Sequence, residues 1–207
     1  MEDRLAPGGT WQLQVRQGDR PLFRDRNQER VAGLTLDGPD WIHEIKYDGY
    51  RLRVERSGRE MRLLTRNGHN WRDCFPLDRR ERAEEPRAAG EAVVLGVSDF
   101  NALHSRRHDE EVQLYAFDVI ALGGEDLRAL PLSMRKTNLA RLLRGRPDGM
   151  FVAPFEPGAI GPDLFGAACR MGLEGIVSKH RARRYQPRNC DWVKVKNRTH
   201  PAMWREL

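Results

Sequence analysis

The sequence predicts an α+β fold class, built on antiparallel sheet with a few surface helices. Short apolar runs with partial alternation are separated by Asp-Gly and Ser-Gly, and these dipeptides are hairpin signals. Two later stretches place apolar residues at helical spacing. The 207 residues contain no internal repeat and no low-complexity tract, and this length has room for one generous domain.

Residues 1–37 are predicted to form a weakly structured N-terminal arm. They are rich in Gly, Arg, Gln and Asp and contain only short apolar patches such as residues 11–15. The composition changes at Pro39, so we expect the main domain to cover residues 38–198. Residues 199–207 then remain as a C-terminal tail.

The first half of the main domain is predicted to be mostly β-strand. The runs 41–45, 50–55 and 61–65 are expected to form an antiparallel meander that turns at Asp48-Gly49 and at Ser57-Gly58.

The middle of the chain combines one charged stretch with two apolar ones. Residues 78–87 are compatible with a helix that stops near Pro86. Residues 91–95 and 112–122 are expected as buried strands, and the second is the most apolar segment of the chain, interrupted by Asp118.

The second half of the domain is predicted to hold two helices and two strands. Residues 134–144 form a predicted helix whose leucines share one face. The basic residues of that helix are expected elsewhere on it: Arg135, Lys136, Arg141 and Arg144. Residues 162–171 form a second amphipathic helix, ended by a glycine. Predicted strands over residues 175–179 and 192–196 close the domain.

The composition argues against a membrane protein and against a secreted disulfide scaffold. Hydrophobic residues make up 39% and charged residues 32%, and no apolar run approaches the ~20 residues that a bilayer span needs. The first residues are acidic and lack the apolar region of a secretory signal. Three scattered cysteines are too few for a disulfide framework or a CxxC metal site. We therefore expect a cytoplasmic protein.

Lysine is rare among the basic residues. The formal net charge is +6, which permits a polyanionic partner, yet only five of the 36 basic residues are lysine. Lysine can lose its proton and attack as an amine, whereas guanidinium stays charged. Each lysine is therefore a candidate for a chemical role. The sequence has no GxxxxGK[ST] loop and no GxGxxG after a strand, so a nucleotide would be bound without a glycine-rich phosphate loop.

The strongest local signal is the stretch of residues 44–51, which reads Glu-Ile-Lys-Tyr-Asp-Gly-Tyr-Arg. Its lysine, Lys46, stands at a predicted strand end, with an acid, a glycine and an arginine on the following turn. This pattern suits covalent attack on phosphorus: the amine must be uncharged to attack, and burial together with nearby cations favours the uncharged form. The alternative is that Lys46 is a surface lysine in an Asp-Gly hairpin.

A second basic signal is the alternation of Lys194 and Lys196 on the last predicted strand. Residues two apart on a strand point to the same face, so the two ammonium groups favour an anion between them, such as a triphosphate. The alternative is a solvated edge strand that uses lysine against aggregation.

Two acids and one aromatic residue add weaker signals. Glu174 opens a β-branched strand and could hold Mg²⁺ or a ribose hydroxyl, or it could be a turn acid after the preceding helix. Glu91 begins another strand, where an unpaired carboxylate would be costly to bury. Phe117 offers a strand aromatic for stacking on a base, although such a residue also fits a core.

In their order along the chain, these motifs resemble the nucleotidyltransferase motifs of ATP-dependent DNA ligases. The stretches that carry the resemblance are Lys46-x-Asp48-Gly49-x-Arg51, Thr65-Arg66-Asn67-Gly68, Gly90-Glu91, Phe117-Asp118, Glu174-Gly175-Ile176-Val177 and Lys194-x-Lys196. The likeness is greatest to the adenylation domain of the bacterial ligase D type. It implies an antiparallel-sheet nucleotidyltransferase (ATP-grasp-like) adenylation domain.

The resemblance implies that Lys46 takes AMP from ATP as a covalent lysyl-AMP. The AMP then passes to a 5′-phosphate at a DNA break, and the strand is sealed in DNA repair. By the same resemblance, Glu44 lies near the adenine amino edge and Phe117 stacks on the base, while Arg51 and Glu91 meet the ribose region.

The remaining roles that the resemblance implies concern phosphate, metal and DNA. Lys194 and Lys196 hold the α-phosphate. Glu174 supports Mg²⁺ and ribose binding, and Asp48 is a second candidate for Mg²⁺. Arg66 meets the phosphate of the nick. The partner is then nicked or broken DNA in a bacterial, nucleoid-associated setting.

The sequence also departs from this family pattern. Only residues 197–207 follow the last lysine motif, too few for the oligonucleotide-binding (OB-fold) barrel that such ligases carry next, so a separate OB-fold or end-joining partner is expected. Two alternatives stay open. One is a nucleotide- or DNA-end-binding remnant that is non-catalytic or depends on a partner, and the other is an RNA ligase or capping-type nucleotidyltransferase.

Overall fold

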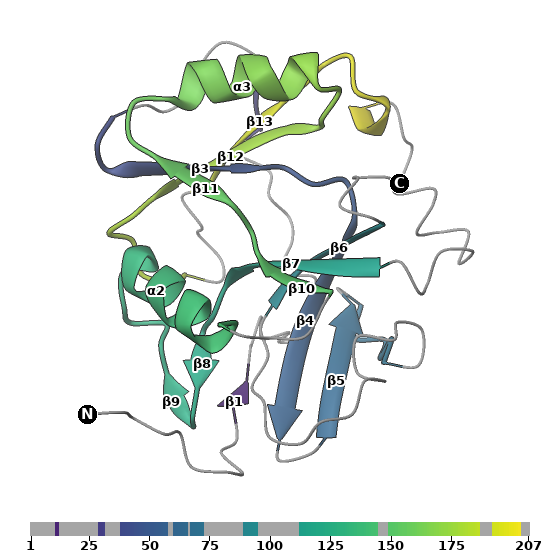
Figure 1. Cartoon of the computed structure of the whole chain (residues 1–207), viewed down its shortest axis with the longest axis vertical. Helices are drawn as coiled ribbons and strands as arrows, with labels where there is room; N and C mark the ends of the chain where they lie inside the picture. The colour runs from purple at the N-terminus through teal and green to yellow at the C-terminus, as the bar shows by residue number, and fades with distance from the viewer. Residues whose placement is uncertain are drawn as a thin grey trace.

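The computed structural model describes residues 11–12, 29–31, 38–57, 60–65, 67–72, 89–94, 112–144, 149–186 and 192–203. These residues form two larger sheets, a small two-stranded sheet and two α-helices (Figure 1). Figure 1 shows one sheet above the other, with α3 over the far side of the upper sheet and α2 beside the lower sheet. The observed architecture is α+β, as predicted.

The first sheet has six strands, and all of its neighbours are antiparallel except β7 and β10. Its strands are β1 (Trp11–Gln12), β4 (Tyr50–Ser57), β5 (Glu60–Thr65), β6 (Ala89–Val94), β7 (Val112–Asp118) and β10 (Met150–Val152). Buried and half-buried residues alternate strictly along β7, so one face of the sheet carries the main core and the other faces away from it.

The second sheet runs in the order β11, β3, β12, β13, β2. Its strands are β11 (Phe155–Pro157), β3 (Trp41–Ile45), β12 (Gly175–His180), β13 (Val193–Lys196) and β2 (Glu29–Val31). Ile176, Val193 and Val195 pack with Ala168 of α3 (Gly161–Arg170) and make the outer face of this sheet apolar. The alternate residues of β12 and β13 point to the inner face.

One predicted connection is wrong. The Ser57-Gly58 signal does join an antiparallel pair, because β4 and β5 pair up to Ser57 opposite Glu60. The Asp48-Gly49 signal joins no hairpin: β3 belongs to the second sheet and β4 to the first. The chain therefore crosses from one sheet to the other immediately after Lys46. A dipeptide signal reports a turn but not which partner each strand takes.

The predicted strand over residues 112–122 is interrupted. β7 ends at Asp118, whose carboxylate accepts a hydrogen bond from the Val119 backbone N–H at 2.9 Å. The chain then forms the separate two-stranded sheet of β8 (Ala121–Leu122) and β9 (Glu125–Asp126). The acid that interrupts the apolar run thus ends the strand.

The helix α2 (Leu132–Leu142) confirms the predicted helix with a shift of two residues, but one part of that prediction is wrong. Arg135 and Lys136 were expected away from the apolar face, and both are buried. The Arg135 guanidinium donates two hydrogen bonds to the Asp118 carboxylate, at 2.8 and 3.0 Å. Burial of a charge is tolerated when it is paired in this way.

Two segments fix where α2 sits. The backbone N–H groups of Leu132 and Ser133, which have no partner inside the helix, donate to the carbonyls of Arg183 and Arg181, each at 2.9 Å. Those carbonyls follow β12, so the first turn of α2 is tied to the second sheet while its leucines pack in the core of the first. The helix therefore touches both sheets.

The remaining elements agree with the sequence or lie outside the described residues. The second predicted helix is α3, and Gly172 follows it with a φ of 70°. The short 3-10 helix η3 (Pro201–Met203) comes last. The helix expected at residues 78–87 lies outside the described residues. The boundaries at residues 37 and 198 stay predictions, although β1 and β2 of the expected arm pair with β4 and β13.

Candidate active site

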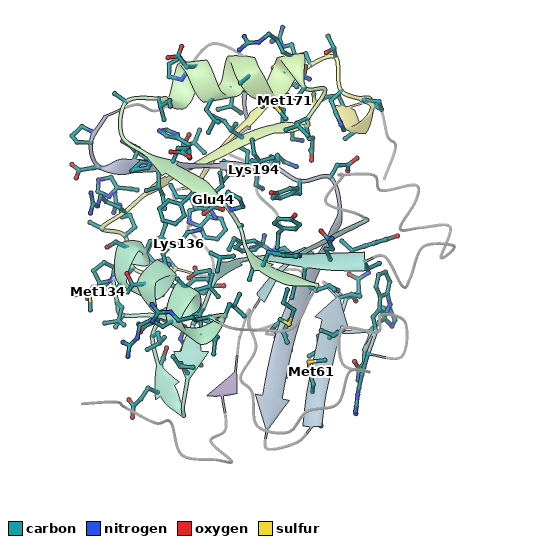
Figure 2. All side chains as sticks on the ribbon, viewed as in Figure 1. Glu44, Met61, Met134, Lys136, Met171 and Lys194 are labelled. Atoms are coloured by element: carbon teal, nitrogen blue, oxygen red, sulfur yellow. The ribbon has the colours of Figure 1, made fainter. Side chains whose placement is uncertain are left out.

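The inner faces of the two larger sheets bring the candidate residues together. In the second sheet, strand alternation puts Glu44, Lys179, Lys194 and Lys196 on the face opposite to α3. Figure 2 shows Glu44 and Lys194 in the space between the two sheets, with Lys136 on the side of α2. Residues from three strands and one helix thus meet in one region.

Lys46 lies at the point where the chain leaves β3. Its backbone N–H donates to the Gly175 carbonyl at 2.9 Å, which holds it beside the start of β12. Its ammonium forms an ion pair with the Glu174 carboxylate, and its side chain is only 18% exposed. Lys46 is therefore an enclosed lysine paired with an acid, not a hairpin lysine directed into solvent.

Glu174 is held in place by a close approach of backbones. It is 6% exposed, and its carbonyl accepts a hydrogen bond from the Asn197 backbone N–H at 2.8 Å. The next residue, Gly175, has a φ of 143°, and a Cβ at that position would lie 2.0 Å from the Val195 carbonyl oxygen. Only glycine allows this approach, which brings Glu174 next to the strand of the two C-terminal lysines.

Lys194 and Lys196 lie on the same face, as their spacing predicts. Both are half-buried, whereas Val193 and Val195 between them are buried on the α3 side. The strand register puts Lys196 opposite Gly175. Three lysines and one glutamate therefore lie around the junction of β3, β12 and β13, and this excess of positive charge suits an anionic ligand.

Phe117 lies in a cluster that joins the two sheets. Its ring meets the Trp192 ring edge-to-face, with centroids 5.8 Å apart. The Arg51 guanidinium carbon lies 5.0 Å from the Phe117 ring centre and 5.8 Å from that of Trp192. Arg51 and Phe117 belong to the first sheet and Trp192 directly precedes β13 of the second, so this cluster closes one part of the space between the sheets.

Glu44 is buried and already has two cationic partners. One of its carboxylate oxygens pairs with Lys136 of α2 and the other with Lys179 of β12. Burial by itself would raise the pKa of Glu44, but the charges of Lys179 and Lys136 hold that pKa below its ordinary value. Both oxygens are thus engaged within the protein, and contact with an adenine amino edge stays a proposal.

Lys179 is the other unusual charge of the site. It is 2% exposed, and burial lowers its pKa to about 8; the charge of Lys136 acts in the same direction, while Glu44 and Asp118 oppose it. Its ammonium lies 4.8 Å from the Phe117 ring centre and 4.1 Å from that of Trp192. Sequence reasoning gave no role to Lys179, Trp192 or Lys136, although the rarity of lysine marked two of them.

An aromatic row supports the loop that carries Lys46. Tyr47 packs on Tyr115 of β7, with ring centroids 5.0 Å apart, and Tyr115 packs on Phe151 of β10 at 5.4 Å. This row fixes the residue next to Lys46 against the first sheet. The two ends of the crossing segment are thus held by different sheets.

Three candidate residues have a more limited description. Arg66 lies outside the described residues. Glu91 lies on β6, where the backbone register puts it opposite Arg51 and Tyr115. Asp48 is buried in the segment after Lys46.

Among the described residues, no group of three or more His, Cys, Asp or Glu could hold a metal ion by itself. None of the described helices is long and apolar enough to cross a membrane.

Solved structures share this arrangement. The ligase domain of LigD from Mycobacterium tuberculosis matches with a TM-score of 0.66 and 32% identity, over 84% of this chain and 62% of that one. A mycobacterial DNA ligase D complexed with ATP and MES matches with a TM-score of 0.65 and 30% identity, over the same shares. The fold and the site thus define a nucleotidyltransferase domain of the type found in ATP-dependent ligases.

The chain belongs to the family described as ATP dependent DNA ligase domain, whose model matches residues 28–196. A curated relative is the multifunctional non-homologous end joining protein LigD of Pseudomonas aeruginosa, which is 35% identical over 179 residues. That match covers 80% of this chain and 21% of the relative. The chain therefore spans about a fifth of the length of this curated relative.

Proposed function

We propose that this chain carries out the nucleotidyl-transfer chemistry of ATP-dependent DNA ligation, with Lys46 as the nucleophile. The observation that carries the proposal is the enclosed Lys46–Glu174 pair beside the strand of Lys194 and Lys196, in a member of the ligase family. A nucleophilic amine, an acid and two further cations are the groups that the transfer of a nucleotide from a triphosphate requires.

In the first step, Lys46 Nζ donates its electron pair to the α-phosphorus of ATP. A P–N bond forms, the bond between the α-phosphorus and its bridging oxygen breaks, and pyrophosphate leaves with that electron pair. The Lys46 ammonium releases one proton to water before attack, and the nitrogen releases a second proton to water once the P–N bond has formed. Displacement of Glu174 from its ion pair by the incoming nucleotide exposes the amine, and Lys194 and Lys196 neutralise the charge that grows on the α-phosphate oxygens.

In the following steps, AMP passes from Lys46 to the 5′-phosphate of a DNA break. The P–N bond breaks, and a P–O bond to the 5′-phosphate oxygen forms. The 3′-hydroxyl then attacks the activated 5′-phosphorus, AMP leaves, and the strand is sealed. Contact of Arg66 with the nick phosphate belongs to this proposal, as do a DNA-repair role and an OB-fold or end-joining partner that clamps the duplex.

The nucleotide is proposed to enter between the sheets with its base on Phe117. Phe117 is half-buried on the inner face of β7, which leaves part of its ring for stacking. Arg51 and Glu91, paired in register on neighbouring strands, are proposed to meet the ribose region. The solved mycobacterial relative holds ATP, which supports ATP as the substrate of this chain as well.

The buried carboxylates near Lys46 fit a Mg²⁺ ion that is shared with the triphosphate. Mg²⁺ usually binds through one or two carboxylates, water and substrate phosphates, not through a complete protein cage. Glu174 and Asp48 are buried acids in the two segments that flank Lys46, so they are the residues that would hold the ion beside the triphosphate. The ion would supply charge neutralisation on the phosphate oxygens.

The test is self-adenylylation with ATP labelled at the α-phosphate, in the presence of Mg²⁺. We expect an acid-labile AMP adduct on the wild-type chain. We expect Lys46→Arg to abolish the adduct, because guanidinium keeps the charge but cannot attack. An undiminished adduct in Lys46→Arg would show that another residue is the nucleophile. Label from GTP but not from ATP would indicate a capping-type enzyme, and the absence of any adduct would indicate a binding module.

A nicked duplex assayed in parallel separates the first step from sealing. We expect sealing to fail in Lys46→Arg and to proceed in the wild-type chain, either alone or with a separate OB-fold protein added. Adduct formation without sealing under both conditions would restrict the function of this chain to the first step.

A further inference from the structure

Lys179 is a buried ammonium that the proposed chemistry does not use. It reaches side chains from three separate parts of the chain: Glu44 of β3, Phe117 of β7, and Trp192 just before β13. Its two aromatic contacts, at 4.8 and 4.1 Å from the ring centres, are within the distance at which a cation attracts the face of an aromatic ring. A single charge thus joins residues of both sheets.

The two rings differ from Lys179 in their exposure. Lys179 is buried, whereas Phe117 and Trp192 are half-buried. The ammonium is therefore closed off from a ligand, but the rings that it contacts are not. The distance between the ring centroids, 5.8 Å at nearly perpendicular planes, is that of an edge-to-face pair in which one ring fixes the tilt of the other.

We propose that Lys179 is a positioning residue for the nucleotide base: held by Glu44, its ammonium lies against Phe117 and Trp192 and fixes the Phe117 ring, with the Trp192 ring perpendicular to it, as the surface on which the purine stacks. This inference rests on the proposed function, because it assumes that the base binds at Phe117. It adds Trp192 and Lys179 to the residues that determine how tightly the base is held.

The charges around Lys179 make its contribution dependent on pH. Burial and the charge of Lys136 of α2 lower the pKa of Lys179, Glu44 and Asp118 oppose them, and the net result is a pKa of about 8. The guanidinium of Arg51 faces the same rings as a second cation. Below about pH 8 the ammonium is charged and holds the rings. Above that pH it becomes neutral, so both the contact with the rings and the ion pair with Glu44 weaken.

The experiment measures the affinity for α,β-methylene ATP, which cannot transfer AMP to Lys46, by calorimetry across the pH range that spans about 8. We expect the wild-type affinity to fall as pH rises through this value. We expect Lys179→Met to bind roughly tenfold more weakly at neutral pH and to lose this inflection, because a desolvated cation–π contact contributes about that factor. Lys179→Arg stays charged, so its affinity should not fall across the same range.

Lys136→Met gives a second measurement, in which Lys179 and the Phe117 and Trp192 rings that it contacts are unchanged. Since the charge of Lys136 lowers the pKa of Lys179, its removal should move the inflection to higher pH. The matched control is Arg141→Met, which removes an exposed charge from the same helix and should leave the inflection where it is. If Lys179→Met does not fold, the wild-type and Lys136→Met profiles decide the question.

The outcomes separate this inference from the function on which it rests. A wild-type chain that forms lysyl-AMP, with the same affinity and pH profile in Lys179→Met, would overturn the inference and leave the function intact. An inflection that Lys136→Met does not move would also overturn it. A wild-type chain that binds no analogue and forms no adduct would overturn both.

Discussion

Lys46 and Glu174 show how two residues far apart in the chain become one functional unit. The acid follows α3 and the lysine follows β3, and the hydrogen bond from the Lys46 N–H to Gly175 brings them together. A carboxylate in this position pairs with the ammonium in the absence of nucleotide. In the proposed reaction Glu174 would leave the ammonium and would help to hold Mg²⁺ and the ribose. The same contact thus stabilises the resting site and prepares it for substrate.

Glu174→Gln tests this unit at the residue scale. The amide keeps the shape but removes the charge, so we expect lysyl-AMP formation to fall about hundredfold or more, comparable to the loss of one electrostatic group at a reacting centre. Single-turnover labelling with α-labelled ATP measures the rate. Glu156→Gln on β11, an exposed acid of the same sheet, is the matched control and should react at the wild-type rate. Equal rates for both variants would contradict a role for Glu174.

At the scale of elements, the pairing of β12 with β13 decides where the charged residues lie. Ile176 opposes Val195 and Gly175 opposes Lys196, and this register puts valines toward α3 and lysines toward the first sheet. A shift by one residue would exchange the two faces. The close approach at Gly175 fixes the register at the end of the strand where Glu174 stands.

Gly175→Ala should disturb this register. The new Cβ would lie 2.0 Å from a backbone oxygen, and the φ of 143° is unfavourable for alanine. We expect the free energy of unfolding, measured in urea, to fall by more than about 2 kcal/mol, together with loss of adduct formation. Gly38→Ala is the control, because Gly38 has a similar φ of 126° with nothing within 4 Å. Its free energy of unfolding should fall only by the cost of the backbone strain, roughly 1 kcal/mol. Equal losses would show that the close approach does not matter.

At the scale of the whole molecule, α2 connects the two sheets. Its leucines pack in the core of the first sheet, its first turn is bonded to the carbonyls after β12, and its Lys136 reaches Glu44 of β3. Glu44 in turn pairs with Lys179. The relative placement of the two sheets, and so the width of the proposed nucleotide site, depends on this buried charge cluster as well as on apolar packing.

The cluster predicts how stability changes in acid. The folded-state pKa of Glu44 lies below its unfolded value of about 4.5, so its contribution to stability is present above that pH and is lost as pH falls through the folded pKa. Lys136→Met removes one of the charges that lower this pKa, and we therefore expect acid unfolding at a higher pH than in the wild type. Circular dichroism during acid titration measures the midpoint. Arg141→Met should keep the wild-type midpoint, and an unmoved midpoint in Lys136→Met would contradict the coupling.

Local patterns were sufficient for much of the fold. Hydrophobic alternation and turn dipeptides predicted β3, β4, β5, β6, β12 and β13 to within a few residues, and helical spacing predicted α2 and α3. Strand alternation also predicted that Lys194 and Lys196 share a face. These features depend on neighbours within a few residues along the chain, so the sequence displays them directly.

Long-range pairing was not available from such patterns. The segment after Lys46 looks like a hairpin in sequence but crosses between sheets, because strand partners are chosen by which faces can be buried together. Lys136 looks like a solvated helix residue, yet it is buried because Glu44 lies within its reach. The value of a buried charge depends on partners from other elements, and those partners are only known once the chain is folded.

The sequence by itself therefore determined many of the strands and both described helices, and it displayed the candidate side chains in the order of the ligase-family motifs. The tertiary structure alone decided that Lys46 meets Glu174, that Lys179 lies against Phe117 and Trp192, and that α2 ties the two sheets together. The physical reason is the distance along the chain over which each interaction acts. Backbone propensity and periodicity act between near neighbours, whereas charge pairing and ring packing act between residues that folding brings together.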